Sequence, residues 1–368
     1  MIEKEIQIVT FNNPYPPDFG GAIDLFYKIK ALSELGVSIY LHIFYDYRED
    51  FSGLMPYCKT INAYKKNKFF IKHFSLLPYC VTSRLSKELV NNLNRSNATI
   101  LFESIRTTGV LKSNLFKHKI AVRCHNIEHE YSWGLYRSEH NWLKKAAFLI
   151  EGYKLKYYET ILNKAHILFP ISYNEYSYFD KHFKNKSIFL PAFHGNKKLQ
   201  VENGFGKYAL YHGDLSTADN IKSAFFIINI FKDLKEKLII ASSTKNSKLL
   251  EEINKHKNIS FSLVSSENEL SELIKNAHIN VLYSFQKSGT KLKVFNALYK
   301  GRHCILNNNM IDDPDILQLC KVAENEKDYK SAVRTLFIQE YILTEERVEA
   351  LKKYDAKQNA AQIIKAIF

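Results

Sequence analysis

Two adjacent glycines, Gly20 and Gly21, end a proline-rich segment, residues 13–21, that follows the first apolar run of the chain. Glycine lets a ligand approach the backbone closely, and a helix that starts here would offer unpaired N–H groups to a phosphate. A tight turn stiffened by prolines would give the same pattern. The position favours ligand contact, because α/β sheets bind ligands at the carboxyl ends of their strands.

A second polar segment, residues 123–131, also follows an apolar run directly. Its His125 could hydrogen-bond a sugar hydroxyl or a phosphate. His125 and His129 lie four residues apart, but the pattern H-N-I-E-H is not H-E-x-x-H and no third ligand is evident, so we expect no metal. His129 or Glu130 could instead anchor the helix that follows.

A third segment, residues 284–298, is a polar loop that leads into a helical pattern in the C-terminal half. Its backbone N–H groups, with Lys291 or Lys293, would suit a diphosphate, whose negative charge must be compensated as it departs. A solvated basic helix start is the alternative. Cations at a helix N-terminus oppose the helix dipole, however, and usually need an anion nearby.

A fourth segment, residues 212–216, reads His-Gly-Asp-Leu-Ser and precedes another helical pattern. By its position it mirrors the first glycine loop, so Gly213 and Ser216 are further candidates for ligand contact. It could also be only a turn in which Asp219 or Asn220 caps the helix.

Short apolar runs alternate with longer helical patterns around these segments, which predicts repeated βαβ units with parallel sheets. Residues 6–11 form the first predicted strand, and apolar spacing from Ala22 to Leu35 predicts the helix that Gly36 ends. The other predicted strands are 38–44, 99–103, 120–123 and 167–171, then 208–211, 238–241, 259–263, 279–283 and 303–306. One long helix is predicted over about 137–165. Residues 189–207 are rich in Pro, Gly and polar residues and are the predicted junction between two α/β domains.

Length and composition agree with two folded domains, since the chain has 368 residues, 46% of them hydrophobic and 24% charged. The N-terminus lacks the apolar region of a signal peptide, and no run of 18 apolar residues occurs. The five cysteines are scattered and form no C-x-x-C pair. We therefore expect a cytoplasmic protein.

The formal net charge of +14 predicts attraction to polyanions, including phosphorylated small molecules and anionic lipids. No zinc-finger spacing, RNP-like motif or helix-turn-helix signature supports nucleic-acid binding. Residues 64–74 combine lysines with phenylalanines and could dock the N-terminal domain on an anionic membrane as a peripheral protein. An ordinary loop with buried Phe and exposed Lys is the alternative.

Together these segments resemble the retaining glycosyltransferases of family four, especially bacterial sugar transferases of cell-surface glycan synthesis. The resemblance covers nearly the whole chain and rests on PPDFGGA, ILFES, RCHNIEHEY, YHGDLS and SFQKSGTKLKVFNALYKGR, with Glu151 and Glu159 between them. It implies a GT-B fold, in which two Rossmann-like domains with parallel sheets face a central cleft. Residues 1–190, completed by the C-terminal helix 344–368, would form the acceptor-side domain, and residues 191–343 the nucleotide-sugar domain.

The resemblance also implies roles for individual residues. It places Gly20 and Gly21 beside the donor diphosphate and the transferred sugar, and His125 near the reacting carbon. Lys291 would neutralise the leaving nucleoside diphosphate. His125 and Lys291 are thus the catalytic candidates. The donor-binding candidates are Gly20, Gly21, Gly213, Ser216, Ser288, Gly289, Thr290, Lys293 and Asn296.

The chain departs from the family at two places. Many members carry Glu-x7-Glu where this sequence has Ser288 and Asn296, although an Asn amide can still hydrogen-bond a ribose hydroxyl. The family's Arg and Lys at the start of the second domain are also replaced, with Asp214, Ser216 and Asn220 nearby.

The implied reaction is transfer of a hexose, such as mannose, with retention from a nucleoside diphosphate sugar to a glycan or lipid-linked acceptor. The departing diphosphate would help to deprotonate the acceptor, so no protein nucleophile, metal or other cofactor is expected. Lipopolysaccharide or capsule synthesis is the implied setting. The alternative is a non-catalytic sugar-nucleotide or nucleic-acid binding module with the same fold.

Overall fold

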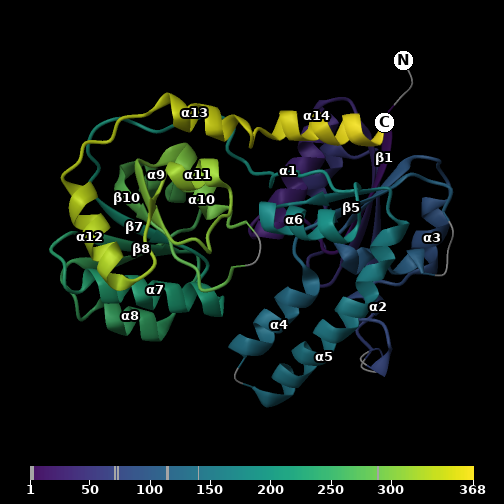
Figure 1. The fold of residues 1–368 in the computed structure, drawn as a ribbon, viewed down its shortest axis with the longest axis horizontal. Helices are drawn as coiled ribbons and strands as arrows, with labels where there is room; N and C mark the ends of the chain where they lie inside the picture. The colour runs from purple at the N-terminus through teal and green to yellow at the C-terminus, as the bar shows by residue number, and fades with distance from the viewer. Residues whose placement is uncertain (1–3, 70–71, 73, 113–115, 140, 288–289) are drawn as a thin grey trace. The chain divides into compact units, whose positions relative to one another are not determined.

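The computed structural model describes residues 4–69, 72, 74–112, 116–139, 141–287 and 290–368. These residues form two compact units, coloured along the chain in Figure 1. Unit 1 extends to Gly195 and also contains Tyr354–Phe368, and unit 2 is Asn196–Lys353. The candidates Ser288 and Gly289 lie outside the described residues.

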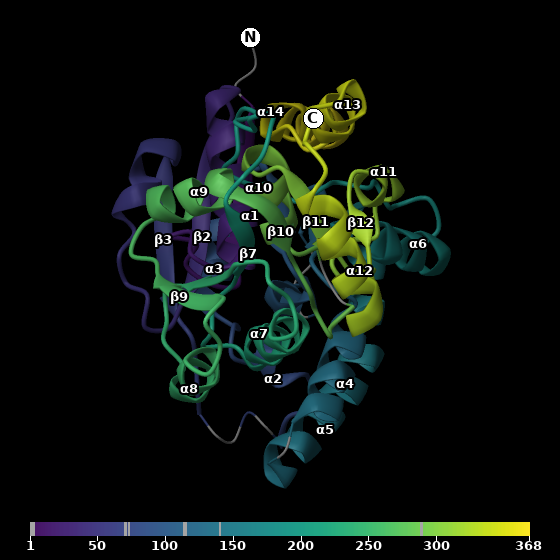
Figure 2. The same cartoon turned by 90° about the vertical axis from the view of Figure 1, so that its left-hand side faces the viewer.

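Unit 1 is built on a six-stranded parallel sheet with the order β3-β2-β1-β4-β5-β6. Its strands are β1 (Glu5–Thr10), β2 (Ser38–Tyr45), β3 (Thr60–Lys65), β4 (Thr99–Glu103), β5 (Ile120–Cys124) and β6 (Ile167–Pro170). The central strands are mostly apolar, and buried clusters cover both faces of the sheet. Helices therefore lie on both sides of it, as Figures 1 and 2 show.

The helical segments of unit 1 include a hairpin of two helices, α4 and α5, that extends beyond the sheet in both views (Figures 1 and 2). The segments are α1 (Gly20–Glu34), η1 (Ser52–Tyr57), α2 (Tyr79–Thr82), α3 (Lys87–Leu93), η3 (Ile105–Leu111), α4 (Glu128–Ser138), α5 (Trp142–Tyr158), η4 (Glu159–Lys164), α6 (Tyr173–His182) and α14 (Ala356–Ile367). The single helix predicted over 137–165 is wrong, since Asn141 caps a new helix by accepting a hydrogen bond from the Lys144 N–H at 3.1 Å.

Unit 2 repeats the architecture with a parallel sheet of order β12-β11-β10-β7-β8-β9. Its strands are β7 (Tyr208–His212), β8 (Leu238–Ser242), β9 (Ile259–Leu263), β10 (Ala277–Val281), β11 (His303–Leu306) and β12 (Lys321–Val322). Its helices are α7 (Ala218–Phe231), α8 (Ser247–Ile253), α9 (Glu267–Asn276), α10 (Lys293–Lys300), α11 (Pro314–Gln318), α12 (Glu326–Phe337) and α13 (Glu345–Lys352). All ten strands predicted from the sequence are present, and the edge strands β3 and β12 are additional.

The C-terminal helical region divides between the two units, unlike the expected assignment of 344–368 to the first domain. Arg347 of α13 is buried and donates hydrogen bonds to the unit 2 carbonyls of Arg302 and Gly301 at 2.9 and 2.7 Å. The buried face of α14, with Ala360 and Ile363, instead joins the core around α1. The chain therefore returns to unit 1 only after α13.

Both sheets change direction beside their first strand, since β1 lies between β2 and β4, and β7 lies between β8 and β10. In such sheets ligands bind outside the carboxyl ends of the strands at this switch point. The loops after β1, β4 and β5 in unit 1, and after β7 and β10 in unit 2, are therefore the places to look for a site.

Candidate functional site

The loop after β1 is held by the buried side chain of Asn13. Its amide donates hydrogen bonds to the carbonyls of Arg48 and Asp50 at 3.1 and 2.7 Å, and its oxygen accepts one from the Tyr15 N–H at 3.0 Å. The Arg48 guanidinium lies 2.8 Å from Asp18 and stacks over the Phe19 ring. These contacts fix the loop that leads into α1.

Helix α1 begins at Gly20, and its N-cap residue Phe19 makes no side-chain capping bond. A Cβ atom at Gly20 would have no atom within 4 Å, whereas one at Gly21 would lie 3.3 Å from the Phe11 ring. The helix therefore presents its first N–H groups on a backbone that stays open at Gly20. This arrangement suits an anion and is the one expected from the sequence.

His125, which follows β5, is oriented by a carboxylate from the neighbouring strand. Its Nε2 lies 3.0 Å from an oxygen of Glu103, the last residue of β4. The Phe11 ring packs edge-on against the imidazole, with the ring centroids 5.6 Å apart. Because Nε2 engages Glu103, Nδ1 is the ring atom available to a ligand.

A buried network of opposite charges extends behind His125. The Lys28 ammonium lies 3.0 Å from Asp24 and 2.9 Å from Glu103, and the Arg123 guanidinium lies 2.9 Å from Asp24. All four side chains are at most 1% exposed. Burial alone would raise the pKa of Asp24, but Arg123 and Lys28 hold that pKa well below its usual range. Both carboxylates are therefore ionised and compensated.

Asp24, Glu103 and His125 bring their ligand atoms within 4.8 Å of one another, a spacing that could suit a metal ion. The Lys28 ammonium, however, already occupies hydrogen-bonding positions on both carboxylates. A cation added here would have to displace a buried lysine from its partners. The residues therefore fit a positioning network for His125 better than a metal site.

Three basic side chains that the sequence analysis did not assign to a ligand site converge on the end of β1. Arg84 donates to the Phe11 carbonyl at 3.0 Å, Lys66 donates to the Asn12 side chain at 3.2 Å, and Arg106 stacks over the Phe11 ring. Burial, and then Arg84, lower the pKa of Lys66 to about 8. Cations collected beside the first turn of α1 favour an anionic ligand at this edge.

His129, the second histidine of the predicted segment, has a structural environment. It is 3% exposed, its Nδ1 lies 3.2 Å from Glu159, and its ring packs on Trp133 and Tyr178. These contacts join α4 to the segment after α5. They match the alternative in which His129 anchors the following helix.

In unit 2, the loop after β7 folds around Asp214. Its carboxylate accepts hydrogen bonds from the Ser216 N–H and hydroxyl at 2.9 and 2.7 Å and from the Thr244 hydroxyl at 3.1 Å. A Cβ atom at Gly213 would lie 3.1 Å from the Asn220 side chain. Gly213 thus permits the close approach of α7, and the Ser216 hydroxyl is committed to Asp214.

Lys293, the first residue of α10, projects toward the end of β7. Its ammonium lies 3.1 Å from the Asn220 side-chain oxygen and 5.1 Å from the centroid of the Tyr211 ring. Burial lowers the pKa of Lys293 to about 8, Asp219 opposes the shift, and Lys291 adds to it. A half-buried cation that a second lysine repels is well placed to bind an anion.

The loop after β10 is tied to the start of α7 through Asp219. One oxygen of Asp219 accepts from the Ser284 hydroxyl at 2.9 Å and the other from the Phe285 N–H at 3.1 Å. Thr290 and Lys291 follow in the same loop, and the Lys291 N–H donates to the Met310 carbonyl at 3.3 Å. The two expected phosphate-binding segments of unit 2 therefore meet at one edge of its sheet.

Asn296 lies one turn into α10, and its side-chain oxygen accepts a hydrogen bond from Asn196 at 2.9 Å. Its amide N–H groups are therefore the part of the side chain that could meet a ribose hydroxyl. A carboxylate at this position, as in the resembled family, would present acceptors only.

No protein-family profile matches this chain. A Klebsiella pneumoniae protein described as an uncharacterized 44.6 kDa protein in the cps region is 27% identical over 326 residues, which cover 80% of each chain. Among the described residues, no helix is long and apolar enough to cross a membrane.

Solved glycosyltransferase structures share the fold of the whole chain. The lipopolysaccharide outer core galactosyltransferase WaaB has a TM-score of 0.66 at 10% identity, covering 99% of this chain and 100% of that one. A glycosyltransferase from Rickettsia africae has a TM-score of 0.64 at 10% identity, covering 100% and 98%. S. aureus TarM, solved with UDP, has a TM-score of 0.64 at 12% identity, covering 99% of each chain. Two parallel α/β units with these neighbours confirm the predicted GT-B fold.

Proposed function

We propose that this protein is a glycosyltransferase that transfers a hexose from a nucleoside diphosphate sugar to a glycan or lipid-linked acceptor. The observation that carries the proposal is Lys293, a half-buried cation beside Lys291 at the switch point of the unit 2 sheet. Such a group is suited to the two negative charges of a diphosphate. The UDP in the TarM structure and the cps-region relative support the donor class and a role in surface glycan synthesis.

In the proposed reaction, the bond between the anomeric carbon and the diphosphate breaks through an oxocarbenium-like state. Lys291 and Lys293 stabilise the charge that develops on the departing diphosphate. A diphosphate oxygen accepts the acceptor's hydroxyl proton as the new glycosidic bond forms on the same face, so the anomeric configuration is retained. No protein nucleophile takes part.

Unit 1 would contribute orientation in this proposal. Glu103 holds the His125 imidazole so that Nδ1 meets a sugar hydroxyl near the reacting carbon, and the first N–H groups of α1 meet a phosphate or the sugar. Lys66, Arg84 and Arg106 favour an acceptor that carries negative charge. The protein would act at the cytoplasmic face of the membrane as a peripheral protein.

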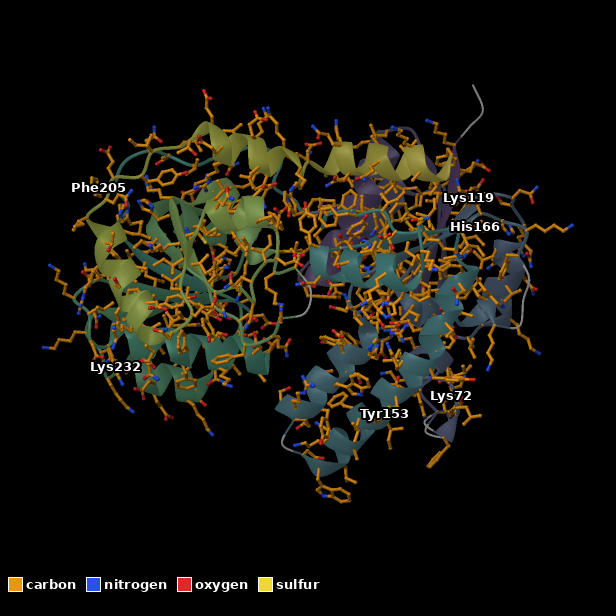
Figure 3. The ribbon with its side chains drawn as sticks, in the orientation of Figure 1. Lys72, Lys119, Tyr153, His166, Phe205 and Lys232 are labelled. Carbon is orange, nitrogen blue, oxygen red and sulfur yellow. The ribbon has the colours of Figure 1, made fainter. Side chains whose placement is uncertain are left out.

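Release of nucleoside diphosphate tests the proposal. A thermal-shift screen of nucleotides and sugar nucleotides would first identify the donor, because a ligand at 100 times its dissociation constant stabilises the fold by about 2.7 kcal/mol. Lys291→Ala should then lower both turnover and donor affinity. Lys232→Ala is the control that removes one charge from the far end of α7, where Figure 3 labels it.

Wild-type turnover and affinity in Lys291→Ala would remove this lysine from the mechanism. Nucleotide binding without acceptor-dependent release, tested across phosphorylated and neutral glycan acceptors, would instead identify a non-catalytic binding module.

A further inference from the structure

Helix α5 exposes a continuous stripe of large apolar side chains. Trp142 is 74% exposed, Tyr153 64% and Tyr157 84%, and Leu143 and Ile150 are 59% and 54% exposed. At about 100° per residue, these five side chains fall within an arc of about 100° on one face of the helix. Large contiguous apolar patches on the surface of a folded protein usually mark an interaction site.

The opposite face of α5 is the one that packs on unit 1. Leu155 and Tyr158 are buried in the core, and Glu151 accepts hydrogen bonds from the N–H groups of Tyr79 and Cys80, both at 2.9 Å. Gly152 packs against the Trp133 ring of α4. The exposed stripe is therefore a second apolar face of a helix whose first face is anchored in the core.

The charges of α5 are strongly biased toward lysine. The helix carries Lys144, Lys145, Lys154 and Lys156, against the single carboxylate of Glu151, which is turned toward α2. By the same helical spacing, Lys154 borders one side of the apolar stripe and Lys156 the other. Long lysine side chains beside apolar surface can place their ammonium groups at the level of lipid phosphates.

A loop elsewhere in unit 1 exposes further apolar side chains. Phe69, Phe74 and Leu76 are 72%, 75% and 91% exposed, and the loop runs into α2, whose first N–H groups are bonded to Glu151 of α5. Lys72 from this loop and Tyr153 from α5 lie at the same end of unit 1 in Figure 3. The loop belongs to the basic segment 64–74 that the sequence had suggested for membrane contact.

We propose that the exposed stripe of α5, with the exposed side chains of Phe69, Phe74 and Leu76, docks unit 1 on the surface of an anionic lipid bilayer. Tryptophan and tyrosine are the residues that favour the membrane interface, where their rings meet acyl chains and their polar atoms meet headgroups. The flanking lysines match phosphate-bearing headgroups and favour a lipid surface over a contact between two copies, whose lysines would repel each other. The helix lies on the bilayer and does not cross it.

Vesicle flotation of the full-length protein tests this surface. We expect binding to mixed phosphatidylcholine–phosphatidylglycerol vesicles, much weaker binding to phosphatidylcholine alone, and release at high salt. The double variant Trp142→Ser, Tyr157→Ser should bind the vesicles at least about tenfold more weakly, because two large side chains are no longer transferred from water into the bilayer. Tyr47→Ser, which alters a tyrosine of unit 1 that is 81% exposed, is the matched control and should bind normally.

Intrinsic fluorescence provides a second measurement that leaves the stripe intact. Trp133 and Trp142 are the two tryptophans of the chain, so Trp133→Phe makes Trp142 the single emitter. Anionic vesicles should shift its emission to the blue, and quenchers attached to lipid chains should reduce it.

Unchanged flotation of the double variant, or unchanged Trp142 emission with vesicles, would overturn the proposal. So would a dimer in vesicle-free solution that the double variant abolishes, because the stripe would then be an interface between two copies. These measurements need no sugar donor, so their failure is distinct from failure of the proposed transfer reaction.

Discussion

The two units differ in how their candidate-site charges are compensated, by ion pairs in unit 1 and by a neutral oxygen in unit 2. In unit 1, Lys28 and Arg123 face Asp24 and Glu103 at 2.9 to 3.0 Å, so each charge of this network has a partner inside the protein. In unit 2, the Lys293 ammonium donates a hydrogen bond to the neutral amide oxygen of Asn220. The carboxylate that acts on Lys293 among the described residues, Asp219, is itself bonded to the loop after β10.

This difference separates a scaffold from a binding site. A network that is paired internally keeps its geometry with or without ligand, which suits the orientation of His125. A partly desolvated lysine that contacts a neutral oxygen destabilises the empty protein, and an anion that binds to it offsets this cost. The comparison therefore assigns positioning to unit 1 and diphosphate binding to unit 2.

The largest effect should follow from Lys28→Met, which keeps the length of the side chain but removes its charge. Asp24 and Glu103 would remain buried with only Arg123 beside Asp24 and the His125 imidazole beside Glu103. Breaking a buried ion pair in this way costs about 3–5 kcal/mol of unfolding free energy. Chemical denaturation of the variant and the wild-type protein measures it.

Lys30→Met is the matched control for this prediction. Lys30 lies on the same helix, half-exposed, with its ammonium over the Tyr57 ring, so its loss should cost about 1 kcal/mol or less. If Lys28→Met cost no more than Lys30→Met, the unit 1 network would not be a scaffold and the comparison would fail.

Lys293→Met should weaken nucleotide binding without lowering the stability of the empty protein, the reverse of the effect expected for Lys28→Met. The empty protein should keep its stability or gain some, because a desolvated charge is removed. Affinity for a nucleoside diphosphate should fall by about 10- to 100-fold, the range for a lost hydrogen bond to a charged group. Calorimetric titration with the nucleotide found in the screen measures this affinity.

Lys300→Met is the control at the other end of α10. Lys300 is also buried enough to have a lowered pKa, but its ammonium bonds to Ser271 at 2.8 Å, away from the loop. Its variant should bind the nucleotide as the wild-type protein does. Equal losses of affinity in the two variants would mean that α10 contributes through its overall charge and not through Lys293.

The fold could be predicted from sequence because it depends on repeated apolar patterns. The central strands are buried on both faces and read as continuous apolar runs, so all ten predicted strands are found. Strand β3 was missed because five of its six residues are at least partly exposed, which leaves no apolar run to detect. The break between α4 and α5 depends on one capping residue, Asn141, in a stretch whose helical pattern otherwise continues.

The candidate site was predictable only in part, because its charged groups come from distant segments. His125 and the lysines of 284–298 lie in polar segments that follow apolar runs, so they could be identified as candidates from the sequence. Glu103 ends an apolar strand and Lys28 lies inside a helix, so neither reads as part of a site until the parallel register brings β4 beside β5. The division of 344–368 likewise depends on the tertiary bonds of Arg347.

The pH dependence of nucleotide binding should report Lys293 directly. Its pKa in the empty protein is about 8, below the ordinary value of 10.5, so the lysine loses its proton as pH rises through 8 while an unfolded chain would still hold it. Stability of unit 2 should therefore rise between pH 8 and 10, and diphosphate affinity should fall by about tenfold between pH 7 and 9. Lys293→Arg should bind without this fall, since arginine stays protonated. A fall of the same size in Lys293→Arg would assign the titration to another group.

The smallest effect should come from Asn296→Ala. The Asn296 oxygen is already engaged by Asn196, so at most its amide N–H groups are lost to a ribose hydroxyl, and the dissociation constant should rise by about fivefold or less. Asn196→Ala breaks the same internal bond while keeping the Asn296 amide, so it should leave affinity close to that of the wild-type protein. If both variants lost affinity equally, the pair would serve only to hold α10 in place. A loss in Asn296→Ala as large as that in Lys293→Met would mean that ribose contacts, rather than the charge of Lys293, dominate donor binding.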